Sequence, residues 1–207
     1  MAAVGLVYLL SHARGRPSVQ GLLLTGIAVS AFAGAATSVL LVSTEEFRLK
    51  VVLFWLAGGL EGRGWDHLRG AFPLIAAGCL GLWLLARTLD VLSLGDDEAA
   101  SLGVRVHAAR IATLTLAALV AGAATAVAGA VPFVGLVAPH ALRPLVGSVA
   151  RRLLPASFAA GAALVILADL ASRTVSARFE LPLGSVTALV GAPYFLLALR
   201  RSAEGGE

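Results

Sequence analysis

Charged residues are scarce in this chain. They make up 14% of its 207 residues, whereas 58% are hydrophobic, and the mean hydropathy is +0.90. Soluble globular domains usually contain about 25% charged residues. A water-soluble fold of this length would need far more polar surface, so the composition indicates a membrane protein.

Cysteine and aromatic residues are also few. The single cysteine, Cys79, excludes an internal disulfide and a metal site built from several cysteines. Aromatic residues make up 6% of the chain and do not alternate with basic residues, which cluster at the ends of apolar runs. We therefore expect no nucleic-acid partner despite the net charge of +4. We also expect no secretory signal, because no basic residue precedes the apolar stretch Ala2–Leu10.

Sequence patterns for catalysis are missing as well. The chain contains no Gly-x-Ser-x-Gly elbow, no His-Glu-x-x-His helix and no phosphate-binding loop. His140 follows Pro139 but has no His, Cys or carboxylate at ligand spacing, which favours a structural role over metal binding or proton transfer. We predict no catalytic, metal or cofactor site, and we expect that the chain does not hydrolyse ATP itself.

Long apolar runs dominate the rest of the sequence. A helix needs about 20 apolar residues to cross a bilayer. Five segments meet or approach this length: Ser18–Val42, Leu68–Ala86, Ile111–Ala130, Leu153–Ser172 and Pro182–Leu199. Ala33–Val39 and Ala121–Val127 are nearly identical and rich in small residues, so we interpret both as packing faces. The predicted fold is all-α and polytopic.

Three apolar segments are shorter or interrupted. Ala2–Leu10 is too short to span a bilayer and is interpreted as the last turns of a helix. Val51–Leu60 is expected to lie at the membrane surface, with Trp55 and Trp65 as interfacial anchors. Val131–Gly147 contains three prolines and is predicted to be a short or irregular membrane element surrounded by protein.

The longest polar, helix-capable segment is Leu94–Arg110, which lies between two apolar runs. Asp96 or Asp97 can cap a short helix, and Glu98 in its first turn favours the positive end of the helix dipole. Gly103 can end this helix with a left-handed residue. The chain would then turn into a second short helix that leads to the membrane. An ordinary loop with one helical turn is the alternative.

The basic residues indicate which side of the membrane this segment faces. Ten of the 16 basic residues fall in the set of loops that includes Leu94–Arg110 and the C-terminus, and six fall in the alternate set. The positive-inside rule places the richer set in the cytoplasm. We therefore expect Leu94–Arg110 to be cytoplasmic.

One carboxylate lies within a predicted span. Asp169 and Arg173 are four residues apart on one helical face and can form an ion pair. Ionisable residues inside membrane segments suggest function, although a simple interfacial pair is an equally good interpretation here. An ion-coupled secondary transporter or channel subunit would need carboxylates deep within the spans, and only Asp169 approaches such a position. An intramembrane enzyme is disfavoured because no catalytic constellation is present.

Six stretches cover nearly the whole chain in a single order. They are LLLTGIAVSA (Leu22–Ala31), FWLAGGLEGRGWDHL (Phe54–Leu68), LSLGDDEAASLGV (Leu92–Val104), AVAGAVPFVGLVAPHALR (Ala126–Arg143), RRLLPASFAAGAALVILADLASR (Arg151–Arg173) and ELPLGSVTALVGAPYFLLALRR (Glu180–Arg201). Together they resemble the permease subunit of the FecCD-type, or type II, ABC importers, which take up iron-siderophores, haem and cobalamin.

This resemblance implies a site and partners. Such permeases form homodimers in the cell (inner) membrane, with the translocation path between the two copies. The segment 94–110 would form cytoplasmic coupling helices that dock on a separate ATP-binding subunit. The coupling residues would be Leu94, Gly95, Asp96, Asp97, Glu98, Ala99, Ala100, Gly103, Val104 and Arg105.

The resemblance also implies roles for residues outside the coupling segment. Arg173 matches an arginine that meets a glutamate on a periplasmic or lipoprotein substrate-binding protein. Val19 and Gln20 match positions near a cytoplasmic gate, and Pro139-His140 matches a structural signature. Permeases of this family have ten transmembrane helices, whereas residues 1–207 correspond to a single permease domain that begins in the fourth. We therefore expect that this polypeptide alone does not transport.

Overall fold

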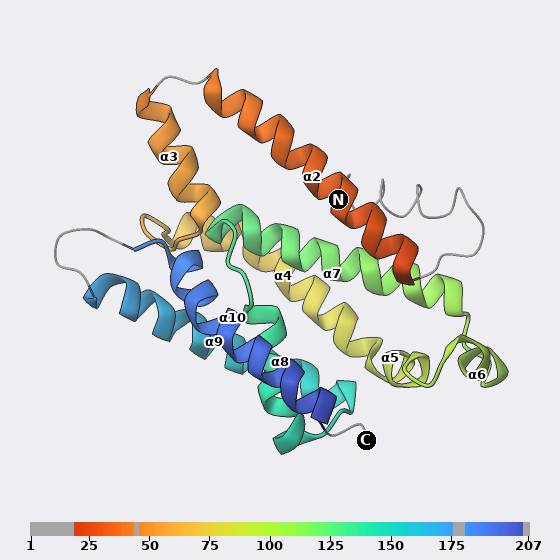
Figure 1. The fold of residues 1–207 in the computed structure, drawn as a ribbon. Coiled ribbons are helices and arrows are strands. Elements are labelled where there is room, and N and C mark those ends of the chain that lie inside the picture. The colour runs from red at the N-terminus through yellow and green to blue at the C-terminus, as the bar shows by residue number, and fades with distance from the viewer. Residues whose placement is uncertain (1–18, 44–45, 176–180, 205–207) are drawn as a thin grey trace. The chain divides into compact units, whose positions relative to one another are not determined.

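The fold consists of helices and their connections over the described residues, 19–43, 46–175 and 181–204, of a computed structural model (Figure 1). This confirms the predicted all-α fold. The stretch Ala2–Leu10 lies outside the described residues. Residues 1–53 form one compact unit and residues 54–207 form another.

The first unit contains α2, which spans Val19–Val42, and the beginning of α3, which spans Glu46–Ala57. The 24 residues of α2 extend about 36 Å at about 1.5 Å per residue, enough for a hydrocarbon core of about 30 Å. The Thr37 hydroxyl donates to the Ala33 carbonyl at 2.8 Å, so this polar group is satisfied inside the helix. The helix matches the predicted span Ser18–Val42.

The second unit contains the remaining helices. They are α4 (Trp65–Leu84), α5 (Ala86–Leu92), α6 (Asp96–Ser101), α7 (Val106–Ala128), α8 (Val134–Val146), α9 (Ala150–Thr174) and α10 (Leu183–Glu204). With α2, the helices α4, α7 and α9 are long and apolar enough to cross a membrane, which bears out four of the five predicted spans. The apolar part of α10, Leu183–Ala198, is shorter.

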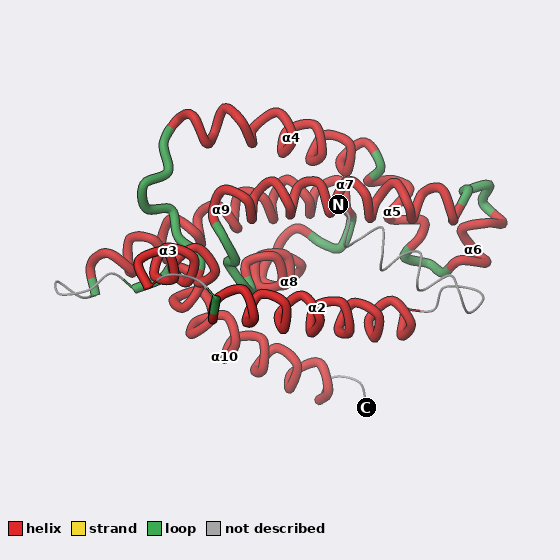
Figure 2. The backbone as a smooth tube through the Cα atoms, turned by 90° about the horizontal axis from the view of Figure 1, so that it is seen from above, coloured by secondary structure: helices red, strands yellow, loops and turns green. Residues whose placement is uncertain are grey.

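The helices of the second unit run back and forth between two ends. Figures 1 and 2 show α4 running in one direction and both α7 and α9 returning in the other. One end therefore carries α5, α6 and the starts of α7 and α9, and we call it the α6 end. The opposite end carries the last turn of α9 and the start of α10, and we call it the α10 end.

Glycines set the close packing of α4 on α7. A Cβ added to Gly78 would collide with a methyl group of Val120, and one on Gly81 would lie 2.9 Å from Leu116 Cδ1. Small residues allow helices in a membrane to approach closely, where van der Waals packing drives association. A Cβ added to Gly122, within the predicted packing face of α7, would meet no atom within 4 Å. The α4–α7 contact thus uses the glycines of α4.

Three further glycines bring separate segments together at the α10 end. Gly58 and Gly129 adopt φ of +77° and +70°, which favour glycine. A Cβ added to Gly184 at the start of α10 would collide with the carbonyl oxygen of Ala57, and it would lie 2.6 Å from that of Ala130. We call Gly58, Gly129 and Gly184 the glycine junction, because they join the ends of α3 and α7 to α10.

The proline-containing segment is short, as predicted, but it is regular. Instead of an irregular stretch over Val131–Gly147, α8 is a 13-residue helix with Pro139 inside it. The irregular part precedes this helix, where Phe133 has a left-handed φ of 65° and packs on Gly191 of α10. Gly191 leaves the space that the Phe133 ring occupies, which supports this uncommon backbone conformation.

Helix α3 begins earlier than the predicted segment Val51–Leu60 and ends at Ala57. Trp55 and Trp65 are both exposed. The position of α3 at a membrane surface remains a prediction.

Candidate functional site

In the segment Leu94–Arg110, Gly95 precedes the first turn of α6. Gly95 has a φ of +124°, and Asp96, Asp97 and Glu98 make up the first turn after it. The prediction that Asp96 or Asp97 caps the helix is wrong, because Gly95 holds the N-cap position and α6 has no side-chain cap bond. The Glu98 carboxylate lies over Gly95, where an added Cβ would collide with it. All three acids still face the positive end of the helix dipole.

The end of α6 follows the prediction. Gly103 has a φ of +82°, and its N–H donates to the Ala100 carbonyl at 3.0 Å. The N–H of Val104 donates to the Ala99 carbonyl at 3.0 Å. These two bonds form a Schellman motif, which satisfies carbonyl groups at the helix end and requires the left-handed residue that glycine supplies.

The predicted second short helix after Gly103 is wrong. Arg105 is the N-cap of α7, which continues without a break for 23 residues. No helix-breaking residue separates Val106 from the apolar run that begins at Ile111, so the membrane helix extends outward into the polar segment. The second short helix is α5, which precedes α6 and was not predicted.

An ion pair holds α6 against α7. Arg110 Nη2 lies 2.7 Å from Asp96 Oδ1 and 3.1 Å from Oδ2. The Asp96 side chain is 52% exposed and that of Arg110 is 31% exposed, so solvent screens part of this attraction. Ala99 is fully buried on the inner side of α6. Together these contacts determine which side of α6 faces outward.

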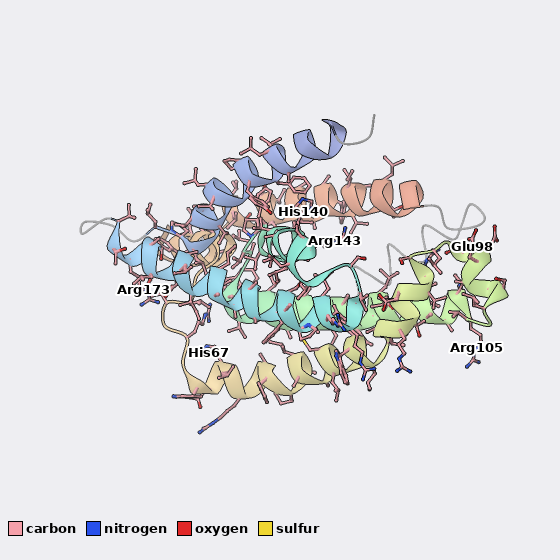
Figure 3. All side chains as sticks on the ribbon, turned by 90° about the horizontal axis from the view of Figure 1, so that it is seen from below. His67, Glu98, Arg105, His140, Arg143 and Arg173 are labelled. Carbon is pink, nitrogen blue, oxygen red and sulfur yellow. The ribbon has the colours of Figure 1, made fainter. Side chains whose placement is uncertain are left out.

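The outward side of this segment combines charge with apolar groups. Asp97, Glu98 and Arg105 are exposed, and Figure 3 shows Glu98 and Arg105 at the same end of the unit. Leu94 is 63% exposed and Leu102 is 64% exposed. We call these five residues the coupling surface. Exposed leucines rimmed by charged side chains could contribute to a contact with another protein.

The α10 end presents a second charged feature. Arg173 Nε donates to Asp169 Oδ2 at 2.9 Å, and Nη2 donates to Oδ1 at 3.1 Å. This confirms that the two residues pair on one face of α9. The two parallel bonds orient the guanidinium group, which is the preferred geometry of arginine on a carboxylate. The Arg173 side chain is 53% exposed and can still meet another acidic group.

The remaining predicted residues are in two other helices, α8 and α2. Pro139 and His140 are in α8, and the His140 ring meets Tyr194 of α10 edge-on, with ring centroids 6.3 Å apart. Among the described residues, no three His, Cys, Asp or Glu side chains gather as a metal site would require. Val19 and Gln20 are the first residues of α2, and their side chains lie outside the described part of the chain.

Two contacts at the start of α9 were not anticipated. The Ala150 N–H donates to Asp90 Oδ1 at 2.7 Å, although the two residues are 60 positions apart. The Arg151 guanidinium carbon lies 5.1 Å from the ring centroid of Trp83. No local sequence pattern signals either contact, since each depends on how α4, α5 and α9 pack.

Comparison with known proteins yields close relatives. The family profile described as the FecCD transport family matches residues 1–201. The hemin transport system permease protein HmuU of Yersinia pestis is 42% identical over 190 residues, covering 92% of this chain and 57% of that protein. The cobalamin import system permease protein BtuC of Halobacterium salinarum is 38% identical over 200 residues, covering 97% of this chain and 53% of that protein.

A solved structure is similar as well. It is an inward-facing conformation of a metal-chelate type ABC transporter, with a TM-score of 0.88 and 32% sequence identity. The similarity covers 96% of this chain and 63% of that one. The chain therefore spans less than two thirds of the length of each of these three relatives.

Proposed function

The chain belongs to the FecCD transport family, and on this premise we propose that it is the permease subunit of an ATP-binding cassette importer. It is a multi-pass α-helical protein of the cell membrane. By the names of its relatives, the cargo is haem, an iron-siderophore chelate or cobalamin. ATP hydrolysis belongs to a separate ATP-binding subunit.

The observation that carries this proposal is the coupling surface at the α6 end. Its exposed acids and leucines stand on a short helix that Ala99 and the Asp96–Arg110 pair hold in place. Such a helix can act as a rigid contact for a partner subunit. In the proposed mechanism the partner binds two states of the permease with different affinity, because only differential binding can shift an equilibrium.

The distribution of arginines supports a cytoplasmic location for the coupling surface. Among the arginines of the second unit whose side chains are described, those at the α6 end are Arg87, Arg105, Arg110, Arg143, Arg151 and Arg152, and those at the α10 end are Arg63, Arg69 and Arg173. This excess at the α6 end follows the positive-inside rule. The α10 end is then the outer end, where Arg173 would receive the substrate-binding protein.

The proposed assembly contains a second copy of the permease, with the path for the cargo between the copies. The open space around Gly122 on α7 agrees with a helix face that packs against another helix of the complete assembly. Val19 and Gln20 are proposed to lie near the cytoplasmic gate, and Pro139-His140 to stabilise the contact between α8 and α10. The contact of His140 with Tyr194 supports the second of these roles.

A gene-deletion experiment tests the proposed function. Cells that lack the gene would be assayed for uptake of radiolabelled haemin, ferric siderophores and cobalamin. We expect uptake of one of these cargoes to fall to background and to return with a plasmid copy. Deletion of the gene for the ATP-binding subunit should give the same loss. Unchanged uptake of all three cargoes would contradict the proposal. Uptake that requires this gene and a proton gradient, but not the ATP-binding subunit, would favour a secondary transporter.

A further inference from the structure

The N-terminus of α9 is capped from a distant part of the chain. Val149 is its N-cap residue and supplies no side-chain cap bond. The N–H of Ala150, at the first helical position, instead donates to Asp90 Oδ1 at 2.7 Å. A carboxylate there satisfies one of the free N–H groups of the helix and meets the positive end of its dipole. The contact is partly buried, which shields it from water.

A second contact joins the same turn of α9 to the end of α4. The Arg151 guanidinium group lies over the ring of Trp83, at 5.1 Å from the centroid. Cation–π contacts of this kind are attractive within about 6 Å. The two contacts fall on consecutive residues of α9 and reach α5 and α4, respectively. They restrain both the position and the direction of α9.

Asp90 is also tied to the turn that leads into the coupling surface. The Ser93 hydroxyl donates to the Asp90 carbonyl at 2.6 Å. The Leu94 N–H donates to the Val91 carbonyl at 3.1 Å, so the turn between α5 and α6 is short and hydrogen-bonded. Asp90 thus contacts α9 with its side chain and Ser93, the residue before the coupling surface, with its backbone carbonyl.

Helix α9 connects this contact with the opposite end of the unit. Its 25 residues begin at Ala150 and end at Thr174, one residue after Arg173. Figure 3 shows Arg173 at one end of the unit, with Glu98 and Arg105 at the other. A displacement of α6 that reaches the start of α9 can therefore be carried along a single helix to Arg173.

We propose that Asp90 is a positioning residue that couples the coupling surface to α9 through its bond to the Ala150 N–H. This inference rests on the proposed importer function. The coupling is reciprocal, because linkage requires that a change at Arg173 affects the α6 end as much as the reverse.

The test compares variants of both partners in the bond, made in the full-length gene. Asp90→Ala removes the acceptor, whereas Asp90→Asn keeps an oxygen that can accept the same N–H. Ala150→Pro removes the donor at the first helical position, where proline is well tolerated, and Val149 already has the extended backbone that a following proline prefers. Asp66→Ala is the matched control, because Asp66 is an exposed acid in the first turn of α4.

The readouts are basal ATP hydrolysis by the purified complex and its stimulation by the substrate-binding protein loaded with haemin, ferric siderophore or cobalamin in turn. We expect Asp90→Ala and Ala150→Pro each to reduce the stimulation at least fivefold while basal hydrolysis stays within twofold. Asp90→Asn should retain at least half of the stimulation, and Asp66→Ala should match the unaltered protein. The double variant Asp90→Ala/Ala150→Pro should be no worse than either single variant.

Two results would overturn the inference. One is unchanged stimulation in Ala150→Pro, which tests the bond even if Asp90→Ala fails to assemble. The other is an additive loss in the double variant, which would mean that the two residues act separately. Failure of the importer function itself would look different, because the unaltered complex would then show no stimulation by any loaded binding protein.

Discussion

Arg173 holds Asp169 across one turn of α9 with two nearly parallel hydrogen bonds, of 2.9 Å and 3.1 Å. This geometry keeps the guanidinium group in one orientation at the α10 end while half of the side chain remains exposed. A docking glutamate from a partner would meet a charge that is already positioned and would not need to order a free side chain.

Arg173→Ala should weaken binding of the substrate-binding protein about tenfold, or about 1.4 kcal/mol, because the lost charge lies at a solvent-exposed part of the contact. Surface plasmon resonance measures the affinity of the substrate-binding protein for the complex in nanodiscs. Arg63→Ala is the control, since Arg63 is an exposed arginine at the same end. If Arg173→Ala and Arg63→Ala bind the substrate-binding protein with equal affinity, Arg173 has no specific docking role.

Charge reversal of the coupling surface should disrupt assembly with the ATP-binding subunit. Asp97→Lys/Glu98→Lys is expected to lower retention of that subunit at least tenfold and to abolish uptake, because it reverses the charge of two exposed side chains in the proposed contact. Membrane insertion should survive, since both side chains are exposed. Co-purification measures the effect, and Glu61→Lys/Asp66→Lys carries the same charge change at the α10 end. Undiminished retention of the ATP-binding subunit in the first variant would argue against its proposed contact with the coupling surface.

The Asp96–Arg110 pair should contribute to the same assembly through the position of α6. A double-mutant cycle with Asp96→Ala and Arg110→Ala should give a coupling energy of about 0.5–1 kcal/mol, since part of the attraction is lost to solvent. That corresponds to an effect of up to about fivefold on the apparent affinity for the ATP-binding subunit. Titration of the ATP-binding subunit onto immobilised permease gives its affinity for the unaltered protein, the two single variants and the double variant. Additive effects of the two single variants would show that the ion pair itself does not contribute to this affinity.

The glycine junction should be sensitive to a single methyl group. Gly184→Ala places a Cβ against backbone oxygens, which cannot move aside as a flexible side chain can, so the fold should lose roughly 1–3 kcal/mol. Gly70→Ala is the matched control, because its Cβ would meet open space within α4, where alanine favours the helix by up to about 1 kcal/mol over glycine. Thermal unfolding in detergent, followed by tryptophan fluorescence, compares them. Equal unfolding midpoints for the two variants would mean that the glycine junction accommodates the added methyl group without a loss of stability.

Features that depend on neighbours along the chain were predictable. The apolar runs indicated α7 and α9 because a membrane helix satisfies its own backbone and needs only length and composition to be recognised. The pairing of Asp169 with Arg173 follows from four-residue spacing on a helix. Gly103 was identified as the end of α6 because the left-handed position there favours glycine.

Features that depend on small local energy differences were mispredicted. Gly95 rather than an aspartate holds the N-cap of α6, where Asp96 is used for the pair with Arg110 instead. Helix α5 was missed because the predicted span ended at Ala86 and the predicted polar segment began at Leu94, so the residues between them were assigned no element. Both outcomes were settled by tertiary contacts, which outweigh preferences of a few tenths of a kcal/mol to about 1 kcal/mol.

The amino-acid sequence by itself determined that this protein is a bundle of membrane helices with a polar helical segment between two of them, since composition and short-range spacing control both properties. Only the tertiary structure decided that Asp90 caps α9 and that Gly184 meets the end of α3. These contacts join residues far apart in the chain, and their energies exist only after the helices have packed. The same holds for the coupling surface, whose exposed side is determined by Ala99 and Arg110 beneath it.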